Sequence, residues 1–299
     1  MNILPKILVT GANGQLGKEL QELAKTTTGY EFVFTPHNEL PVDEAIAVNE
    51  AVQKIQPGFL VNCAAYTAVD KAETEKEKAF RINGEAPGIL AKACKKNNCR
   101  FIHISTDYVF SGEGTLPYKE TDATGPKGVY GASKLMGEEN AMANNPETII
   151  IRTSWVYSQY GHNFVKTMLR LMNEKESISV VNDQQGSPTW AAGLAKAILH
   201  LIERIHHNRA SASGVYHYCD EGITNWYEFA LAIKEYTGSP CKVLAISTAE
   251  YPTPAKRPAW SALDTEKIVK EQQVDILPWK TQLQNCLQQL SATATGNLF

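Results

Sequence analysis

The sequence has no long apolar run and no excess of charge of either sign. Its 299 residues include 29 Lys and Arg against 32 Asp and Glu, which gives a formal net charge of -3. A membrane helix needs about 20 consecutive apolar residues, and binding to nucleic acid or to an anionic membrane calls for a basic surface. We therefore expect no nucleic-acid partner and no membrane partner. The first apolar stretch is interrupted by Pro5 and Lys6, which makes a poor signal peptide and predicts a cytoplasmic protein.

Cysteine is sparse and unpatterned. The six cysteines include no CxxC pair, and no Cys/His cluster has the spacing of a zinc site. Free cysteines in a reducing compartment behave as small apolar side chains. We therefore expect free thiols and no bound metal.

Short apolar segments alternate with amphipathic ones along the first half of the chain. Strand patterns occupy residues 6–10, 31–35, 59–63, 101–105 and 148–152, and helical patterns occupy residues 45–55, 76–94 and 130–144. Strands that alternate with helices indicate a parallel sheet covered on both faces. The sequence thus predicts an α/β fold, a doubly wound, Rossmann-like parallel sheet.

The pattern loosens after about Ser154. A short strand is expected at 178–181, helices at 191–205 and 226–237, a loop at 206–213, a strand at 215–219 and irregular chain at 249–258. We predict a dinucleotide-binding domain with the catalytic residues at 1–154. Residues 155–299 are expected to form mainly a smaller, mixed substrate-binding lobe, although the chain can cross back between the two.

Three glycines lie between the first predicted strand and the first predicted helix. Gly11 permits a sharp turn, Gly14 lets the backbone approach a pyrophosphate, and Gly17 allows close packing of helix and strand. The helix N-terminus favours an anion. The spacing is GxxGxxG rather than GxGxxG, but its place between strand and helix predicts dinucleotide binding.

The choice of cofactor depends on the end of the second strand. An acidic residue there would hydrogen-bond the ribose of NAD. Here the strand ends in Thr35, Pro36, His37 and Asn38, and the first acid is Glu39. We expect NADPH, with NADH possible.

A tyrosine and a lysine open the helix predicted at 130–144. Tyr130 and Lys134 are four residues apart, so they share one helix face. An ammonium beside a phenol lowers the pKa of the phenol, which would let Tyr130 exchange a proton with a carbonyl oxygen. Ser105 and Thr106 end the preceding strand, where a hydroxyl can bind the same oxygen. Together with the glycine loop, these residues predict a nicotinamide-dependent reductase.

Longer segments give the chain a specific resemblance. They are GANGQLG at 11–17, VNCAAYTAVDKAE at 61–73, STDYVFSG at 105–112, YGASKLMGE at 130–138, RTSWVYS at 152–158, NDQQGSPT at 182–189 and KRPAWSALDTEK at 256–267. In this order they resemble the extended short-chain dehydrogenase/reductase family, over about residues 6–283. Within that family the chain is most similar to enzymes that use NADPH to reduce the 4-keto group of dTDP-4-dehydro-L-rhamnose. The resemblance implies a dTDP-sugar substrate and the last step of dTDP-rhamnose biosynthesis.

The resemblance also implies roles for individual residues. The implied catalytic residues are Tyr130, Lys134 and Thr106. Implied cofactor contacts are Gly11, Gly14, Gln15, Leu16, Gly17, Val42, Ala64, Ala65, Tyr66, Thr67, Tyr130 and Lys134. Implied substrate contacts are Thr67, Thr106, Asp107, Tyr130, Trp155 and Arg257.

Two positions depart from the family pattern. An aspartate common near position 41 is replaced by Pro41, which puts side-chain contacts to the adenosine in doubt while leaving backbone contact by Val42 possible. Some relatives form dimers bridged by magnesium through carboxylates; Glu19 matches one such position, but residues 190–193 (WAAG) lack the second acid. We therefore expect no metal, and a monomer or a homodimer.

The sequence is also compatible with other functions. The chain could be a reductase or epimerase of another 4-keto sugar nucleotide, or a non-catalytic regulatory relative. A dehydratase is disfavoured because Tyr108 stands where such enzymes carry a glutamate after Asp107. Arg257 could form only a surface ion pair, Trp155 could belong to the core, and Asp107 could cap a strand end.

Overall fold

A six-stranded parallel sheet forms the centre of the computed structural model, which describes residues 4–208 and 211–296. Across the sheet the strands are β10 (Gly214–His217), β5 (Ile149–Thr153), β4 (Arg100–Thr106), β3 (Phe59–Asn62), β1 (Lys6–Thr10) and β2 (Glu31–Thr35). The strand order reverses at β1, which pairs with β2 on one side and β3 on the other. Open α/β sheets bind ligands outside the carboxyl ends of the strands at such a reversal. The predicted α/β class is confirmed.

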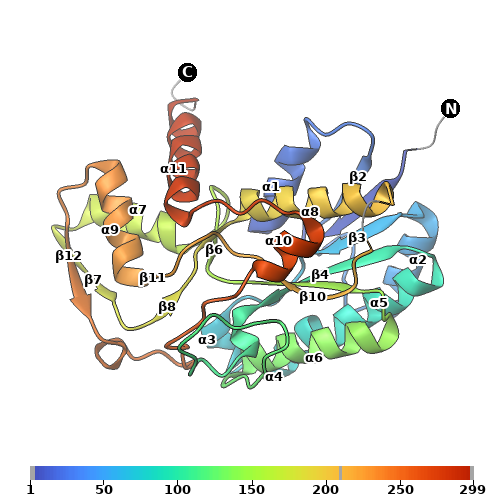
Figure 1. Cartoon of the computed structure of the whole chain (residues 1–299), viewed down its shortest axis with the longest axis horizontal. Coiled ribbons are helices and arrows are strands. Elements are labelled where there is room, and N and C mark those ends of the chain that lie inside the picture. Colours follow the sequence, from blue (N-terminus) through green and yellow to red (C-terminus); the bar gives the residue numbers. More distant parts are fainter. Residues whose placement is uncertain (1–3, 209–210, 297–299) are drawn as a thin grey trace.

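Helices cover both faces of this sheet (Figure 1). One face carries α1 (Gln15–Ala24) and α8 (Ala191–His206), and the other carries α2 (Ala45–Ile55), α5 (Ala86–Lys96) and α6 (Val129–Asn144). Strands buried on both faces are continuous apolar runs, so alternate residues of each strand enter different cores. Val9, Val61 and Ile102 pack with α1 and α8, whereas Leu8, Leu60 and Phe101 pack with α2 and α5.

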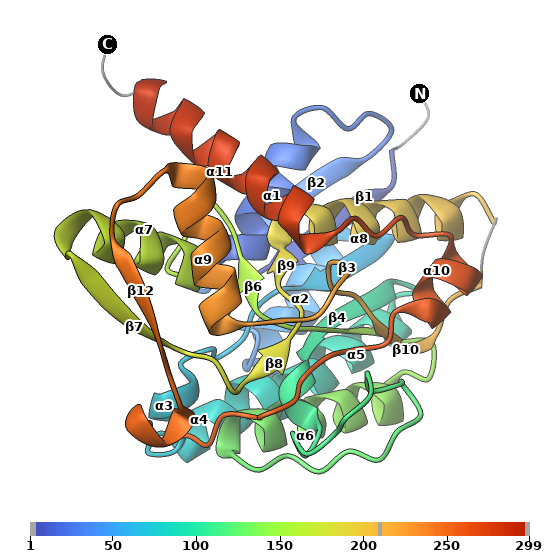
Figure 2. The same ribbon diagram turned by 60° about the vertical axis from the view of Figure 1, so that its left-hand side comes forward.

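A second core lies beside the sheet, in the C-terminal half of the chain (Figure 2). Its elements are β6 (Val156–Tyr157), α7 (Phe164–Glu174), β7 (Ser177–Val181), β8 (Gln185–Gly186), β9 (Thr189–Trp190), β11 (Thr224–Asn225), α9 (Trp226–Thr237), β12 (Lys242–Ile246) and α11 (Trp279–Gly296). The chain returns to the large sheet between these elements, because α8 packs on α1 and β10 pairs with β5. A short helix, α10 (Glu266–Gln272), packs on β10. The domain division at residue 154 stays a prediction.

The helical region expected at 76–94 is confirmed, but it contains a π-helical turn that was not predicted. The segment is divided into α4 (Lys76–Ala79), a π-helical turn (Phe80–Glu85) and α5, after a short α3 (Val69–Ala72). A π-helical turn re-aims side chains and is frequent at functional sites. The expected strand at 215–219 is also displaced, to Gly214–His217. Residues 209–210 of the expected loop lie outside the described residues.

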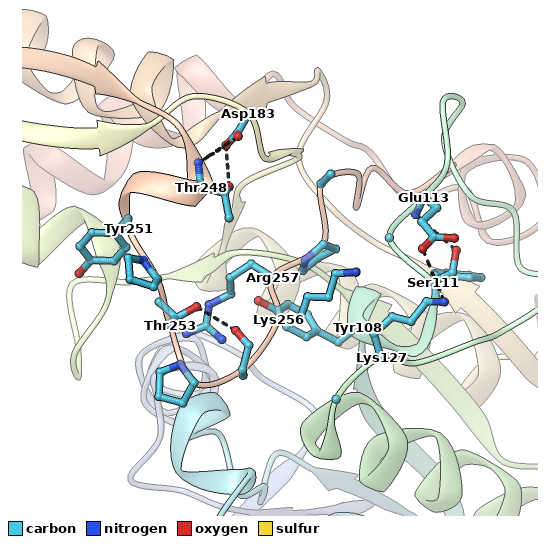
Figure 3. Close-up of a pocket in the computed structure, with 18 residues that line it drawn as sticks. Tyr108, Ser111, Glu113, Lys127, Asp183, Thr248, Tyr251, Thr253, Lys256 and Arg257 are labelled. Atoms are coloured by element: carbon cyan, nitrogen blue, oxygen red, sulfur yellow. Dashed lines mark hydrogen bonds and ion pairs between the residues drawn. The ribbon is translucent and has the colours of Figure 1, made fainter.

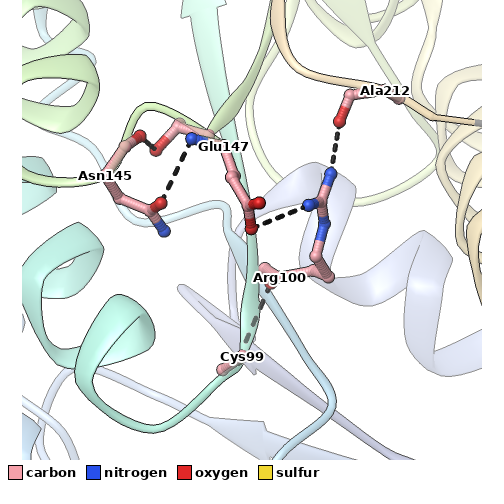
Figure 4. Close-up of polar contacts among 6 residues, drawn as sticks. Cys99, Arg100, Asn145, Glu147 and Ala212 are labelled. Carbon is pink, nitrogen blue, oxygen red and sulfur yellow. Dashed lines mark hydrogen bonds and ion pairs between the residues drawn. The ribbon is translucent and has the colours of Figure 1, made fainter.

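One arginine fastens the amino ends of three strands (Figure 4). Arg100 begins β4, and its Nη1 donates to Glu147 Oε2 at 3.0 Å in the connection before β5. Its Nη2 donates to the carbonyl of Ala212, just before β10. One side chain therefore links the amino ends of β4, β5 and β10.

A buried ion pair fastens α6 to the sheet near the opposite edge. Arg152 on β5 donates to Glu138 on α6 through Nε (2.9 Å) and Nη2 (2.7 Å). The side chains are 5% and 4% exposed. Ser105 on β4 also donates to Glu138. Buried charges persist only when paired and hydrogen-bonded, so this cluster fixes α6 relative to β4 and β5.

Removing the arginine alone is expected to be costly. Arg152→Met leaves Glu138 as an uncompensated buried carboxylate, which should lower the free energy of unfolding by about 3 kcal/mol. Arg170→Met is the matched control, because it breaks an exposed pair with Glu174 (60% and 52% exposed) and should cost less than about 0.5 kcal/mol. Urea unfolding measures both. Equal losses in the two variants would contradict this account.

Candidate active site

The glycine loop brings three backbone segments into contact at the end of β1. Gly11 has φ +66°, and a Cβ there would lie 2.5 Å from the nitrogen of Ala64. A Cβ on Gly17 would lie 2.5 Å from the oxygen of Gly11. Both positions therefore require glycine for packing. Gly14 differs, because a Cβ there would meet only Gly11 O at 3.2 Å, so its small size leaves space for a ligand.

The N-terminus of α1 keeps its amide groups available. Gly14 is the N-cap residue, and no side chain caps the helix. Gln15 turns its side chain toward the C-terminal half, where its Oε1 accepts from Asn163 Nδ2 at 2.8 Å, and Leu16 is buried in the core. Any contact from Gln15 or Leu16 to an anion at this helix end would come from backbone N–H groups.

The segment after β3 is held in place by Asn83, a residue whose role was not predicted from the sequence. Asn83, in the π-helical turn, accepts from Tyr66 N at 2.8 Å and donates to Tyr66 O at 3.0 Å. Its amide also donates to Ser133 on α6 at 3.1 Å. Asn83 thereby ties residues 64–67 to the helix that carries Tyr130. Its sequence context looked like an ordinary helix, so no signal marked it.

The other expected cofactor residues lie along the same edge. Ala64 and Ala65 are half-buried, Thr67 is exposed, and Val42 is buried in the core beside α2. Next to Val42, Asp43 forms an ion pair with Arg81 at 2.9 Å. These positions are compatible with a dinucleotide across the strand ends, and their individual roles stay predictions.

Tyr130, Thr106 and Asp107 meet where β4 ends. The Thr106 hydroxyl is hydrogen-bonded with the Tyr130 hydroxyl and donates to Asp107 Oδ1 at 2.9 Å. The ring of Tyr108 packs edge-on against Tyr130, with centroids 5.5 Å apart. A hydroxyl, a phenol and a carboxylate therefore converge at one point of the carboxyl edge.

The expected effect of Lys134 on Tyr130 is not observed. Burial raises the pKa of Tyr130 to about 12, whereas the helical spacing had suggested a lowered pKa. Lys134 points into the sheet instead, where its Nζ donates to Ile104 O at 2.6 Å. Burial lowers the pKa of this lysine to about 8. Within the protein alone, the two side chains share a helix face without pairing.

Asp107 is an acid held in an apolar setting. It is 3% exposed, and burial raises its pKa to about 7, against hydrogen bonds with Thr106 and Ser261 that lower it. Its Oδ2 has no hydrogen-bond partner in the described structure. Ser261 also accepts from Trp155 Nε1 at 3.2 Å. The segment KRPAWSALDTEK was recognised in the sequence, but Ser261 was not singled out within it.

Trp155 has a strained backbone and a stacked ring. Its φ is +48°, a conformation that bulky residues rarely adopt without functional reason. Its ring lies on Trp226 with centroids 3.6 Å apart and planes 8° apart. One face of Trp155 is thus covered by the second core, and the indole N–H is directed to Ser261.

A cavity of about 490 Å³ opens next to Tyr108. Lys127, Lys256 and Arg257 are among its lining residues, and Figure 3 shows Lys256, Arg257 and Tyr108 lying together. Arg257 donates to Asp70 at 2.7 Å and hydrogen-bonds Tyr108, while its buried Nη1 has no partner among the described residues. The ion pair expected as the alternative is therefore present, together with a donor left over for a ligand.

The described residues offer neither a metal-binding cluster nor a membrane-spanning helix. Across residues 4–208 and 211–296, no group of three or more His, Cys, Asp or Glu side chains is arranged to hold a metal ion. Glu19 is buried and accepts from Ser158 at 2.6 Å. In the same part of the chain, no helix is long and apolar enough to cross a membrane.

A doubly wound sheet with a glycine loop after β1 and a Tyr-x-x-x-Lys helix after β4 defines a short-chain dehydrogenase/reductase. The chain belongs, more narrowly, to the family of the RmlD substrate binding domain, whose model matches residues 5–292.

Full-length relatives agree with this family. The chain is 42% identical to dTDP-4-dehydrorhamnose reductase of Escherichia coli strain K12, over 96% of this chain and 98% of that protein. It is 40% identical to the spore coat polysaccharide biosynthesis protein SpsK of Bacillus subtilis, over 97% and 99%. The structure of dTDP-4-dehydrorhamnose reductase from Bacillus anthracis in complex with NADP superposes with a TM-score of 0.90, at 37% identity over 96% and 100% of the two chains.

The buried carboxyl of Asp107 predicts a pH-dependent stability. Its folded pKa of about 7 exceeds the ordinary 3.8, so folding favours the protonated acid and stability falls as pH rises between these values. Asp107→Asn removes this penalty. The variant should gain about 4 kcal/mol over the parent at about pH 8 and nothing near pH 4. Urea unfolding across pH measures this, and the exposed Asp275→Asn is the control. A gain independent of pH would contradict the assignment.

Proposed function

We propose that this chain is an NADPH-dependent dTDP-4-dehydrorhamnose reductase, which converts the 4-keto group of dTDP-4-dehydro-L-rhamnose to the alcohol of dTDP-L-rhamnose, the last step of dTDP-rhamnose biosynthesis. The observation that carries the proposal is the contact of the Tyr130 and Thr106 hydroxyls at the end of β4. Full-length relatives that carry this enzyme's name support the choice of substrate.

The residues at the carboxyl edge fit a dinucleotide. Gly14 leaves room at an uncapped helix N-terminus, where backbone N–H groups would hold the pyrophosphate. The end of β2 offers an exposed His37 and no acid before Glu39, which suits the 2′-phosphate of NADPH and leaves NADH possible. A similar structure bound to NADP supports the same choice.

The reaction needs a hydride for carbon and a proton for oxygen. When bound, the nicotinamide supplies the hydride. A pKa of about 12 keeps the proton on Tyr130 at neutral pH, so this phenol is ready to protonate the developing alkoxide. The Thr106 hydroxyl would donate a hydrogen bond to the same oxygen and stabilise its growing charge. Lys134 lies one turn further along α6, where it would hold the ribose.

The cavity beside Tyr108 fits the rest of the substrate. A nucleotide diphosphate is an anion, and Lys127, Lys256 and Arg257 border this space. The unpartnered Nη1 of Arg257 offers a donor for a phosphate oxygen. Asp107 Oδ2, which is also unpartnered, is placed to accept from a sugar hydroxyl, and Trp155 would pack against the sugar.

We also propose that the enzyme works in the cytoplasm, as a monomer or homodimer without bound metal. Its six cysteines are free thiols, five of them buried, which suits a reducing compartment. Size-exclusion chromatography with light scattering, with and without magnesium, tests the assembly.

Changing the phenol should separate chemistry from binding. Tyr130→Phe removes the proton donor, so kcat should fall by about 10²- to 10⁴-fold with little change in cofactor affinity. The measurement follows loss of NADPH or NADH absorbance with dTDP-4-dehydro-L-rhamnose, with product analysis and a separate fluorescence titration of NADPH. Near-normal turnover would overturn the assignment of Tyr130.

The same assay distinguishes the other candidate functions. Net oxidation of NADPH identifies a reductase, whereas an epimerase would return the hydride and oxidise none. A folded, NADPH-binding parent that oxidises nothing would direct the search to other 4-keto sugar nucleotides. If none of those substrates is reduced either, the remaining hypothesis is that the chain is a non-catalytic regulatory relative.

Arg257 should act on substrate affinity. Arg257→Met removes a donor to a diphosphate, which should raise KM for the dTDP-sugar by about 10- to 100-fold with kcat little changed. Asp70→Asn is the matched control, because it breaks the same ion pair and keeps the guanidinium. Equal increases in KM for both variants would show that the ion pair alone matters.

A further inference from the structure

A row of buried polar side chains crosses the apolar sheet at one level. Thr10, Asn62 and His103 are register partners on β1, β3 and β4, so their side chains share one face of the sheet. Thr10 Oγ1 donates to Asn62 Oδ1 at 2.6 Å, and Asn62 Nδ2 lies 3.0 Å from His103 Nδ1. The row ends at Lys134, whose Nζ lies 3.4 Å from His103 Nε2. The proposed reaction assigns no task to these three residues.

The contacts of Asn62 determine which nitrogen of His103 carries hydrogen. Asn62 Oδ1 also accepts from the backbone N–H of Ala64, at 3.2 Å, and a backbone N–H can only donate. The amide nitrogen of Asn62 is therefore the atom that faces His103 Nδ1. Because an amide NH₂ is only a donor, Nδ1 must accept, and a neutral imidazole then carries its hydrogen on Nε2.

This tautomer directs a donor at Lys134. An ammonium is also only a donor, whereas a free amine has a lone pair that can accept from His103 Nε2–H. The other groups facing Lys134 are the Ile104 carbonyl, which accepts from it, Glu138, whose charge favours the ammonium, and the Cys63 thiol. Burial raises the pKa of Cys63 to about 12, so this thiol is neutral near pH 7. Glu138 is already engaged by Arg152 and Ser105. Burial lowers the pKa of His103 far below its ordinary range, so the imidazole stays neutral.

We propose that Thr10, Asn62 and His103 are positioning residues that fix the imidazole tautomer facing Lys134 and so favour the free amine of this lysine over its ammonium. A free amine can take up a proton at the end of α6 that carries Tyr130, and release it again. Lys134 can therefore act as a proton carrier and is not a permanently charged group. Its consequence for turnover rests on the proposed reductase function; the state of Lys134 does not.

Asn62→Asp tests the tautomer directly. The carboxylate can still accept from Thr10 and Ala64, but its second oxygen faces His103 Nδ1 and requires hydrogen there. His103 Nε2 then becomes an acceptor for an ammonium. Long-range ¹H–¹⁵N spectra of the imidazoles should show this change of tautomer. The pKa of Lys134, followed by the ¹³Cε shift of labelled lysine, should rise from about 8 toward the ordinary ~10.4.

A double-mutant comparison separates the tautomer from the added charge. In a His103→Leu background, Asn62→Asp can act on Lys134 only through its charge, so the rise in pKa should be smaller than with His103 present. Equal rises in the two backgrounds would overturn the proposal. His103→Gln serves where leucine impairs folding, because its amide restores a donor toward Lys134 and should keep the pKa low.

The parent protein provides its own reference. His217 is also buried, but its Nδ1 faces two carbonyls, Tyr118 O at 3.1 Å and Asp264 O at 3.2 Å, so its hydrogen belongs on Nδ1. The spectra should therefore show two buried neutral histidines of opposite tautomer. His103→Gln removes one set of signals, and His200→Gln, on α8, is the control that leaves both and the pKa of Lys134 unchanged. Hydrogen on Nδ1 of His103 in the parent would overturn the proposal.

Turnover gives a second, separate readout. In Asn62→Asp, the pH at which kcat changes should move upward with the pKa of Lys134, while KM for the dTDP-sugar stays within about twofold. A shifted lysine with an unshifted kcat profile would refute the proton-carrier role. If the parent protein were inactive, the reductase assignment would be wrong. The spectroscopic test of the His103 tautomer and of the Lys134 pKa would not be affected.

Discussion

The pairing of Glu138 with Arg152 is the interaction on which the active site depends. Tyr130 and Lys134 lie on α6, whereas the groups that they meet lie on β4. Only a rigid attachment of α6 to the sheet keeps these two sets together, and Glu138 supplies it by bonding to β5 through Arg152 and to β4 through Ser105. Close packing of α6 on the π-helical turn, where Asn83 reaches Ser133, secures the other side of the helix. The positions of the reactive groups at the carboxyl edge therefore depend on the contacts that attach α6 to the sheet.

Burial, more than proximity of charge, decides the protonation of the central groups. It raises the pKa of Tyr130 and Asp107 and lowers that of Lys134, so each is displaced toward its neutral form. A protonated phenol at Tyr130 suits the reduction of a ketone, because the developing alkoxide must receive a proton. The cationic side chains near the site, Lys127, Lys256 and Arg257, lie along the neighbouring cavity instead.

The sequence predicted the sheet well, because strands buried on both faces are short apolar runs that differ from the amphipathic helices between them. It predicted Gly11, Gly14, Gly17, Thr106, Tyr130 and Lys134 as a group, since each follows a strand or opens a helix. It did not predict the direction of Lys134, because helical spacing fixes the face of a residue but not the neighbour across the sheet. Asn83, Ser261 and the row from Thr10 to His103 were missed for the same reason. Their partners are distant in the chain: strand register joins Thr10, Asn62 and His103, while packing of the fold brings Asn83 to Tyr66 and Ser261 to Trp155.

The chain returns to the large sheet after β9, with α8, and this return limits how the two cores can move. The elements α8 and β10 belong to one core, while the segments before and after them belong to the other. The two cores are therefore joined by several chain connections and not by one linker. A cut in any single connection would leave both cores incomplete, so neither half is an autonomous module. Opening and closing over a substrate would have to bend all these connections together.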